Sequence, residues 1–168
     1  MGWDEFHELT HNFAATAFRL EQQPVYAVDL DDHYKAFLAG RAGYPEELDG
    51  YVAWLDQIRD LTAAGKRMER VRVQTEPLSD YHRYARWVGQ WNVEAGEIIH
   101  YITREQAEAS GLLPAAGNDD WWFLDDSRLL VMEFDDAGNM VTRRLETDDV
   151  ALTRARTLWE LALRAVPS

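Results

Sequence analysis

Apolar residues recur every three or four positions at the start of the chain. These positions are Phe6, Leu9, Phe13, Ala17 and Leu20. This spacing places the side chains on one face of an α-helix, which is typical of a helix with a buried stripe. Asp4 is a residue type that caps helix N-termini, and Pro24 cannot continue a helix. The pattern therefore predicts one helix over residues 4–21.

The helical spacing continues as far as Gly65. It predicts a second helix that begins at Asp31 or Asp32 and a third helix over residues 46–64. Gly65 is a suitable residue to follow the end of this third helix. Between the first two helices, residues 25–28 predict a short extended piece.

After Gly65 the apolar residues alternate with polar ones, which is the period of a β-strand. The predicted strands are residues 70–74, 97–102, 121–124 and 129–134. The predicted helices begin at Ser79 or Asp80, at Arg104 and at Thr147. Turn residues occupy the segments 125–127 and 136–138. The order β-α-β-α-β-β-α indicates a sheet covered by helices.

These patterns predict an α+β or α/β fold. We expect residues 1–65 to form a helical segment that packs on an α/β domain of residues 66–168, so that the chain is one compact unit. The composition supports a folded core, because 46% of the 168 residues are hydrophobic, with seven Trp, seven Tyr and six Phe.

The composition also narrows the location and the partners. No apolar run approaches the roughly 20 residues of a membrane span, and the chain begins with the acidic sequence Met1-Gly2-Trp3-Asp4-Glu5. The chain has no cysteine. We therefore expect a cytoplasmic location and no association with a membrane. The net charge of −13 argues against direct nucleic-acid binding and favours a protein partner with a basic face.

The stretch His7-Glu8-Leu9-Thr10-His11 matches the H-E-x-x-H motif of zinc proteases. On a helix, His7 and His11 lie one turn apart and could bind one Zn²⁺, with Glu8 as general base. The candidates for a third ligand are Asp31, Asp32 and His33. No longer zinc-protease motif follows, and only six residues precede His7. We therefore expect no cofactor, with zinc as the alternative.

A basic stretch lies between Lys66 and Arg86. It holds six basic and three acidic residues, a net charge of +3, which leaves −16 for the rest of the chain. Arg70 and Arg72 alternate with valines, so both project from the same face of their strand. The strand leads into the N-terminus of the next helix, where α/β folds often hold anions.

These features predict an anion or phosphate pocket. It uses Arg72, Ser79 and Arg83, with Glu76 or Asp80 orienting the arginines. The full set of ligand-binding candidates is Arg72, Glu76, Ser79, Asp80, Tyr81 and Arg83. In the alternative interpretation, these arginines pair with carboxylates on a solvated surface.

Several motifs along the chain are specific as a set. They include Thr16-Ala17-Phe18-Arg19-Leu20-Glu21, Gly65-Lys66-Arg67, Glu76-Pro77-Leu78-Ser79-Asp80-Tyr81, Ala95-Gly96-Glu97 and Trp122-Phe123-Leu124-Asp125-Asp126. With these motifs the chain resembles, over nearly its whole length, an uncharacterised actinobacterial family of domains of unknown function. The resemblance implies a protein often encoded near helix-turn-helix regulators, without an established activity.

The part of the chain after Gly65 also resembles one half of a phospholipase D-like domain, whose catalytic motif is H-x-K-x-x-x-x-D. If Asp125 stands for the motif's aspartate, then Asn118 replaces the histidine and Asp120 replaces the lysine. The resemblance therefore implies a copy of the fold that has lost its catalytic motif.

These observations favour a non-catalytic binding or regulatory module, either a partner of a DNA-binding regulator of the helix-turn-helix kind or a small-ligand sensor. The chain lacks cysteine, G-x-S-x-G, a P-loop and G-x-G-x-x-G. The alternatives are a zinc-dependent hydrolase, or a hydrolase of a phosphorylated ligand that uses Arg72, Glu76 and Asp80.

Overall fold

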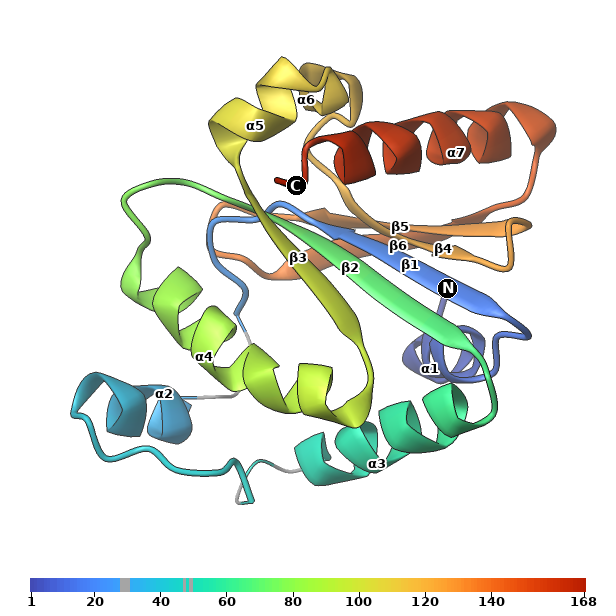
Figure 1. Cartoon of the computed structure of the whole chain (residues 1–168). Helices are drawn as coiled ribbons and strands as arrows, with labels where there is room; N and C mark the ends of the chain where they lie inside the picture. Colours follow the sequence, from blue (N-terminus) through green and yellow to red (C-terminus); the bar gives the residue numbers. More distant parts are fainter. Residues whose placement is uncertain (28–30, 47, 49) are drawn as a thin grey trace.

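A computed structural model describes residues 1–27, 31–46, 48 and 50–168, and its centre is a six-stranded sheet (Figure 1). The strands are β1 Thr16–Glu21, β2 Arg67–Gln74, β3 Ile98–Thr103, β4 Asp120–Leu124, β5 Arg128–Phe134 and β6 Met140–Glu146. Their order in the sheet is β3-β2-β1-β4-β5-β6. The strands β1, β2 and β3 are parallel, whereas β4 is antiparallel to β1, and β5 and β6 continue the antiparallel half.

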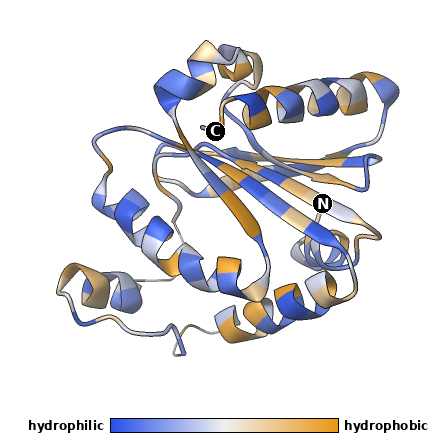
Figure 2. Cartoon of the chain, in the orientation of Figure 1, coloured by the Kyte–Doolittle hydropathy of each residue, from blue (hydrophilic) through white to orange (hydrophobic). Residues whose placement is uncertain are grey.

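Helices cover both faces of this sheet (Figure 1). On one side lie α1 Trp3–His11, α3 Tyr51–Ala63 and α4 Asp80–Ala95, with α2 Asp31–Leu38 beside α4. On the other side lie α5 Arg104–Ala109, α6 Leu112–Ala115 and α7 Asp149–Arg164. Along the long helices, hydrophobic residues alternate with hydrophilic ones at helical spacing (Figure 2). The chain thus has the mixed α and β composition that the sequence predicts.

The sheet separates two hydrophobic cores. The first core contains Leu20 of β1 and Leu158 and Trp159 of α7. The second contains Ala17 of β1 together with Leu55 of α3 and other residues of α1 and α3. The central strand β1 therefore contributes to both cores.

The prediction of one helix over residues 4–21 is wrong for the second half of this range. The helix α1 ends at His11, and residues 16–21 form β1 in the middle of the sheet. The carboxylate of Asp125 fixes the change of direction, because it accepts hydrogen bonds from the backbone N–H groups of Ala14, Ala15 and Thr16, at 2.8, 2.7 and 3.1 Å. A strand that is buried on both faces need not alternate, so its apolar residues can imitate helical spacing.

Most other predicted elements are present with shifted ends. The strands predicted at 70–74, 97–102, 121–124 and 129–134 correspond to β2, β3, β4 and β5. The predicted second helix is α2, and the helix predicted over 46–64 begins later, at Tyr51. The tight turn over residues 125–127 is confirmed, with positive φ angles of 52° at Asp125 and 55° at Asp126.

Two further differences concern extended segments. The strand β6 is missing from the sequence-based order, because it is a largely exposed edge strand with little apolar patterning. The predicted extended piece at 25–28 has no regular structure over residues 25–27, and Val28 lies outside the described residues. The division into residues 1–65 and 66–168 stays a prediction.

The connection between β3 and β4 reverses the direction in which strands are added to the sheet. The chain passes from β3 through α5 and α6 to β4, on the far side of β1, so β1 and β4 become neighbours. Ligand sites in open α/β sheets favour the carboxyl ends of strands at such a point. Among the described residues, no helix is long and apolar enough to cross a membrane.

Candidate functional site

A small cavity lies at the carboxyl ends of β1 and β2, beneath the first turns of α4. Its lining residues are Glu21, Gln23, Tyr26, Arg72, Val73, Gln74, Tyr81, His82 and Ala85. The volume of about 10 Å³ has room for about one water-sized group. The helix α4 begins above the cavity because the Ser79 side chain caps it, accepting a hydrogen bond from the His82 backbone N–H at 3.1 Å.

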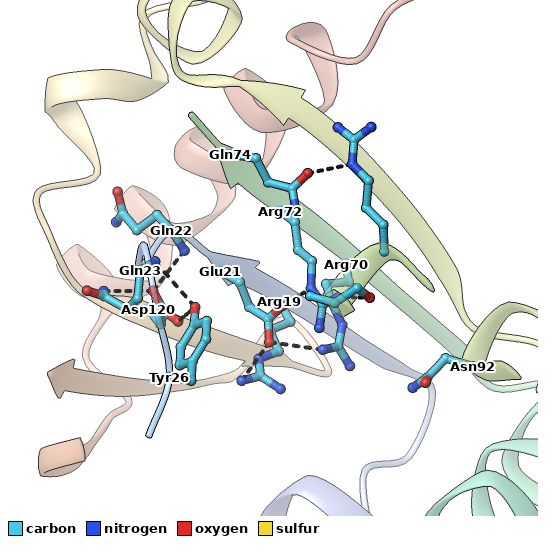
Figure 3. Close-up of polar contacts among 12 residues, drawn as sticks. Arg19, Glu21, Gln22, Gln23, Tyr26, Arg70, Arg72, Gln74, Asn92 and Asp120 are labelled. Atoms are coloured by element: carbon cyan, nitrogen blue, oxygen red, sulfur yellow. Dashed lines mark hydrogen bonds and ion pairs between the residues drawn. The ribbon is translucent and has the colours of Figure 1, made fainter. Parts of the chain in front are cut away.

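Beside the cavity, Glu21 is the centre of a buried ionic cluster (Figure 3). Glu21 is only 4% exposed. Its carboxylate accepts hydrogen bonds from Arg70 Nη1 at 2.9 Å and from Arg72 Nε, and it forms an ion pair with Arg19 Nη2 at 2.8 Å. On its other side, Arg70 binds the buried Glu97 at 2.7 Å. The cluster thus joins β1, β2 and the residue before β3.

The pKa shifts show that these groups remain charged. Burial alone would raise the pKa of Glu21, but Arg19, Arg70 and Arg72 outweigh it and hold the pKa well below its usual range. Burial would lower the pKa of Arg72, but Glu21 outweighs it and the pKa is raised. The cluster is therefore a fixed set of ions.

Two buried polar groups at the cavity have no hydrogen-bond partner among the described residues: Gln74 Nε2 and His82 Nδ1. Gln74 is 2% exposed, and its Oε1 accepts a hydrogen bond from Arg86 Nε at 2.6 Å (Figure 3). This contact assigns the amide orientation and leaves Nε2 as a donor. Buried polar groups usually have partners, so these two point to a ligand or a bound water.

His82 is 5% exposed and neutral, because burial lowers its pKa. Its Nε2 lies 3.5 Å from the backbone oxygen of Gln23. A carbonyl oxygen can only accept, so this long contact favours the tautomer with the proton on Nε2 and a lone pair on Nδ1.

A second buried carboxylate holds the segment that follows β1. Asp120, at the start of β4, is completely buried. It accepts hydrogen bonds from the Gln22 backbone N–H and from Gln23 Nε2, both at 3.0 Å, and from the Tyr26 hydroxyl (Figure 3). Burial raises the pKa of Asp120 to about 6. Because Gln23 and Tyr26 line the cavity, Asp120 fixes one of its walls.

The structure brings only part of the predicted anion pocket together. Arg72 and Tyr81 line the cavity. The other candidates, Glu76, Ser79, Asp80 and Arg83, are exposed and are not among the lining residues. Arg83 instead pairs with Asp80 one helical turn away and donates to the Leu78 carbonyl at 3.0 Å.

Part of the basic stretch is buried, whereas the alternative interpretation places its arginines on a solvated surface. Arg70 and Arg72 do share one face of β2, as predicted, since both reach Glu21. Arg70, however, is only 4% exposed, so its ion pairs are not on a solvated surface.

The H-E-x-x-H motif lies on α1, where the rings of His7 and His11 are 5.2 Å apart. His11 packs against Trp54 and contacts the Thr10 hydroxyl through Nδ1 at 3.1 Å. Of the predicted third ligands, His33 contacts the Tyr84 hydroxyl at 2.8 Å, and the Asp31 side chain lies outside the described residues. The described part of the chain contains no group of three His, Cys, Asp or Glu residues that could hold a metal.

Sequence reasoning missed Glu21, Gln74, His82 and Asp120 as residues of one site. Glu21 stood inside a predicted helix, and its position at the end of a buried strand was therefore hidden. A possible signal was the pair Arg70 and Arg72, because two arginines on one face of a strand need carboxylate partners if that face is buried.

Comparison with protein families identifies a family that covers nearly the whole chain. Residues 4–167 match a family described as "Domain of unknown function (DUF6879)". No curated protein matches the chain. The family match agrees with the resemblance to an uncharacterised family that the sequence motifs indicate.

Proposed function

We propose that this chain, which belongs to the DUF6879 family of domains of unknown function, is a non-catalytic module that binds a small polar ligand. The site is the cavity at the carboxyl ends of β1 and β2. Such a module acts as a sensor. The cavity is formed by β1, β2, α4 and the segment after β1, so a bound ligand changes the contacts among these elements.

The observation that carries the proposal is the pair Gln74 Nε2 and His82 Nδ1. Both atoms are buried and without a partner among the described residues, and both residues line the same cavity. Leaving such groups unpaired costs about 1–3 kcal/mol each, and a ligand that pairs them recovers this free energy. The position at the carboxyl ends of two parallel strands, β1 and β2, supports the same conclusion.

Binding is favoured over catalysis because the acidic groups nearby are already engaged. Glu21 is held by three arginines, and Asp120 is held by Gln22, Gln23 and Tyr26. Proton exchange with a substrate at either carboxylate would break these buried contacts.

The similarity to a phospholipase D-like half domain is a finer part of this proposal. In that alignment Asn118 and Asp120 take the places of the catalytic histidine and lysine. A buried carboxylate that holds Tyr26 cannot serve the role of a phosphate-binding lysine. The similarity therefore supports a module that binds without turnover.

The proposal is tested by thermal unfolding of the pure protein in a library of small polar metabolites. A ligand at 100 times its Kd stabilises the folded state by about 2.7 kcal/mol, which raises Tm by about 5–10 °C in a chain of this size. Gln74→Met removes the free donor and should abolish the shift. The matched control is Gln90→Met on the exposed face of α4, which should retain it. A library that leaves Tm unchanged, or a shift that survives Gln74→Met, would contradict a binding site at this cavity.

A second candidate function is the binding of a protein with a basic face, such as a helix-turn-helix regulator. It is favoured by the charge distribution, because Arg70 and Arg72 of the basic stretch form buried or half-buried ion pairs and the chain still carries a net charge of −13. Such a partner should associate rapidly at low salt and more slowly as salt rises. A nuclease-treated pull-down at two salt concentrations tests it, and a partner that is equally retained at both would count against electrostatic recognition.

A further inference from the structure

We propose that the cavity beside Gln74 and His82 takes one oxygen of a carboxylate group, so that the ligand is a small monocarboxylic acid. The inference rests on the proposed function, since it names the chemical class of the ligand at the same site. It follows from the guanidinium group of Arg72 at the cavity, the hydrogen-bonding groups left free around the cavity, and the acidic groove outside it.

The buried cluster contains more positive than negative groups in direct contact. Arg19, Arg70 and Arg72 share two carboxylates, Glu21 and Glu97. Arg19 and Arg72 are partly exposed, with 19% and 17% of their side chains accessible, so solvent screens part of their charge. Asp120 lies on the same face of the sheet and interacts with Arg19 through its charge, although its hydrogen bonds are with Gln22, Gln23 and Tyr26. Arg72 contacts one carboxylate, Glu21, and is the arginine of this cluster that lines the cavity, so it is the cation that a bound anion would meet.

The free groups around the cavity are mainly hydrogen-bond donors. Gln74 Nε2 has no partner. Arg72 uses Nε for Glu21 and Nη1 for the Ala85 carbonyl, and its Nη2 has no hydrogen bond to a described residue. The Tyr81 hydroxyl likewise makes none within the described part of the chain, and it lines the same cavity. A carboxylate accepts several hydrogen bonds at once and suits these donors better than a neutral or cationic group.

His82 can adapt to such a ligand. Its Nε2 contact with the Gln23 carbonyl is 3.5 Å long, which is the outer limit of hydrogen bonding and holds the tautomer weakly. Burial and the nearby guanidinium groups of Arg72 and Arg86 lower the pKa of His82, and a carboxylate at the cavity would oppose them and favour a proton on Nδ1. Ligand binding should therefore change the protonation of the imidazole ring at Nδ1.

The surroundings limit the ligand to one negative charge. The cavity has room for about one water-sized group, so one carboxylate oxygen fills it and the remainder of the molecule extends outward past Gln23. Gln23 also lines an open groove of about 310 Å³, whose charged lining residues are Arg104, Asp119, Asp135 and Asp136. Three acidic residues against one basic residue disfavour a second anionic group, which argues for a monocarboxylate over a phosphate or a diacid.

Formate, formamide and formamidinium test the inference, because the three probes have nearly the same size and shape but are anionic, neutral and cationic. The readout is the NMR spectrum of the His82 ring nitrogens and the Gln74 side-chain amide in the full chain. We expect formate to shift both signals and to protonate Nδ1, and we expect the other two probes to leave Nδ1 unprotonated.

Two substitutions locate the effect. Gln74→Glu removes the donor and adds a negative charge, so the response to formate should be lost, whereas Gln90→Glu on the exposed side of α4 should retain it. Asp120→Asn removes a nearby negative charge and should strengthen formate binding several-fold.

Each other outcome overturns a defined part of the inference. A larger response to formamide or formamidinium at the same signals overturns the carboxylate class but leaves the ligand-binding function standing. A formate response that survives Gln74→Glu places the anion elsewhere and overturns the site. No response to any probe overturns the inference, and the thermal screen with Gln74→Met then decides separately whether the proposed function also fails.

Discussion

At the scale of single residues, the site is organised by two buried carboxylates with opposite pKa shifts. Glu21 is held ionised by Arg19, Arg70 and Arg72, so its pKa is lowered. Asp120 has no such cation in contact, and burial raises its pKa to about 6. The two groups therefore respond to pH in different ranges, and only Asp120 titrates near neutral pH.

The Asp120 shift predicts how stability depends on pH. The carboxyl binds its proton more tightly in the folded state, with a pKa of about 6, than at its ordinary value of 3.8. Its contribution to stability is therefore complete below pH 3.8 and is lost as pH rises through 6. Between pH 4.5 and 7 this loss amounts to on the order of 2 kcal/mol.

Asp120→Asn should remove this part of the pH dependence. We expect the difference in unfolding free energy between wild type and variant, measured by urea denaturation, to shift in favour of the variant by about 2 kcal/mol from pH 4.5 to pH 7. Asp119→Asn, at the neighbouring half-exposed position, controls for the loss of one acidic charge. Parallel pH profiles for Asp120→Asn and wild type would show that Asp120 is ionised throughout this range.

At the scale of elements, the sequence predicts those whose pattern is decided locally. The strand β2 shows the alternating period of a strand, and Ser79 caps the N-terminus of the helix α4. The strand β1 could not be distinguished from a helix, since both of its faces are buried and Ala17 and Leu20 belong to different cores. The site was missed for the same reason, because Glu21 and Asp120 meet only when β1 and β4 pair.

The turn between β5 and β6 contacts the segment that contributes Tyr26 to the cavity lining. Gly138 has a φ of +82°, and its carbonyl accepts a hydrogen bond from the Ala27 backbone N–H at 2.9 Å. A Cβ at this position would lie 2.5 Å from the backbone oxygen of Val25. The glycine therefore permits both the left-handed turn and the close approach of residues 25–27.

Gly138→Ala should destabilise the protein by more than about 2 kcal/mol, because it adds a backbone clash to the roughly 1–2 kcal/mol cost of the left-handed conformation. Gly117→Ala is the matched control, with a φ of +70° and no atom within 4 Å of the added Cβ. It should cost only the conformational part. Urea denaturation of both variants measures the difference, and equal costs would mean that residues 25–27 move away without penalty.

At the scale of the whole molecule, the two cores are joined through one sheet. Trp121 packs in the core on the α7 side, and Trp122 packs in the core on the α3 side, although they are adjacent in sequence. The strand β1 pairs with β2 on one edge and with β4 on the other. Removing β1 would therefore expose two central strand edges and part of both cores at the same time.

This arrangement predicts that residues 66–168 do not fold without residues 1–65. The truncated chain should show no cooperative thermal transition by circular dichroism, whereas the full chain should unfold in one transition that is the same by circular dichroism and tryptophan fluorescence. Co-expression of residues 1–65 with residues 66–168 is the control, and it should restore the cooperative transition, because β1 can pair with β2 and β4 without a covalent connection. If residues 66–168 alone unfold cooperatively, the division near residue 65 marks a true domain boundary, and the sheet tolerates the loss of its central strand.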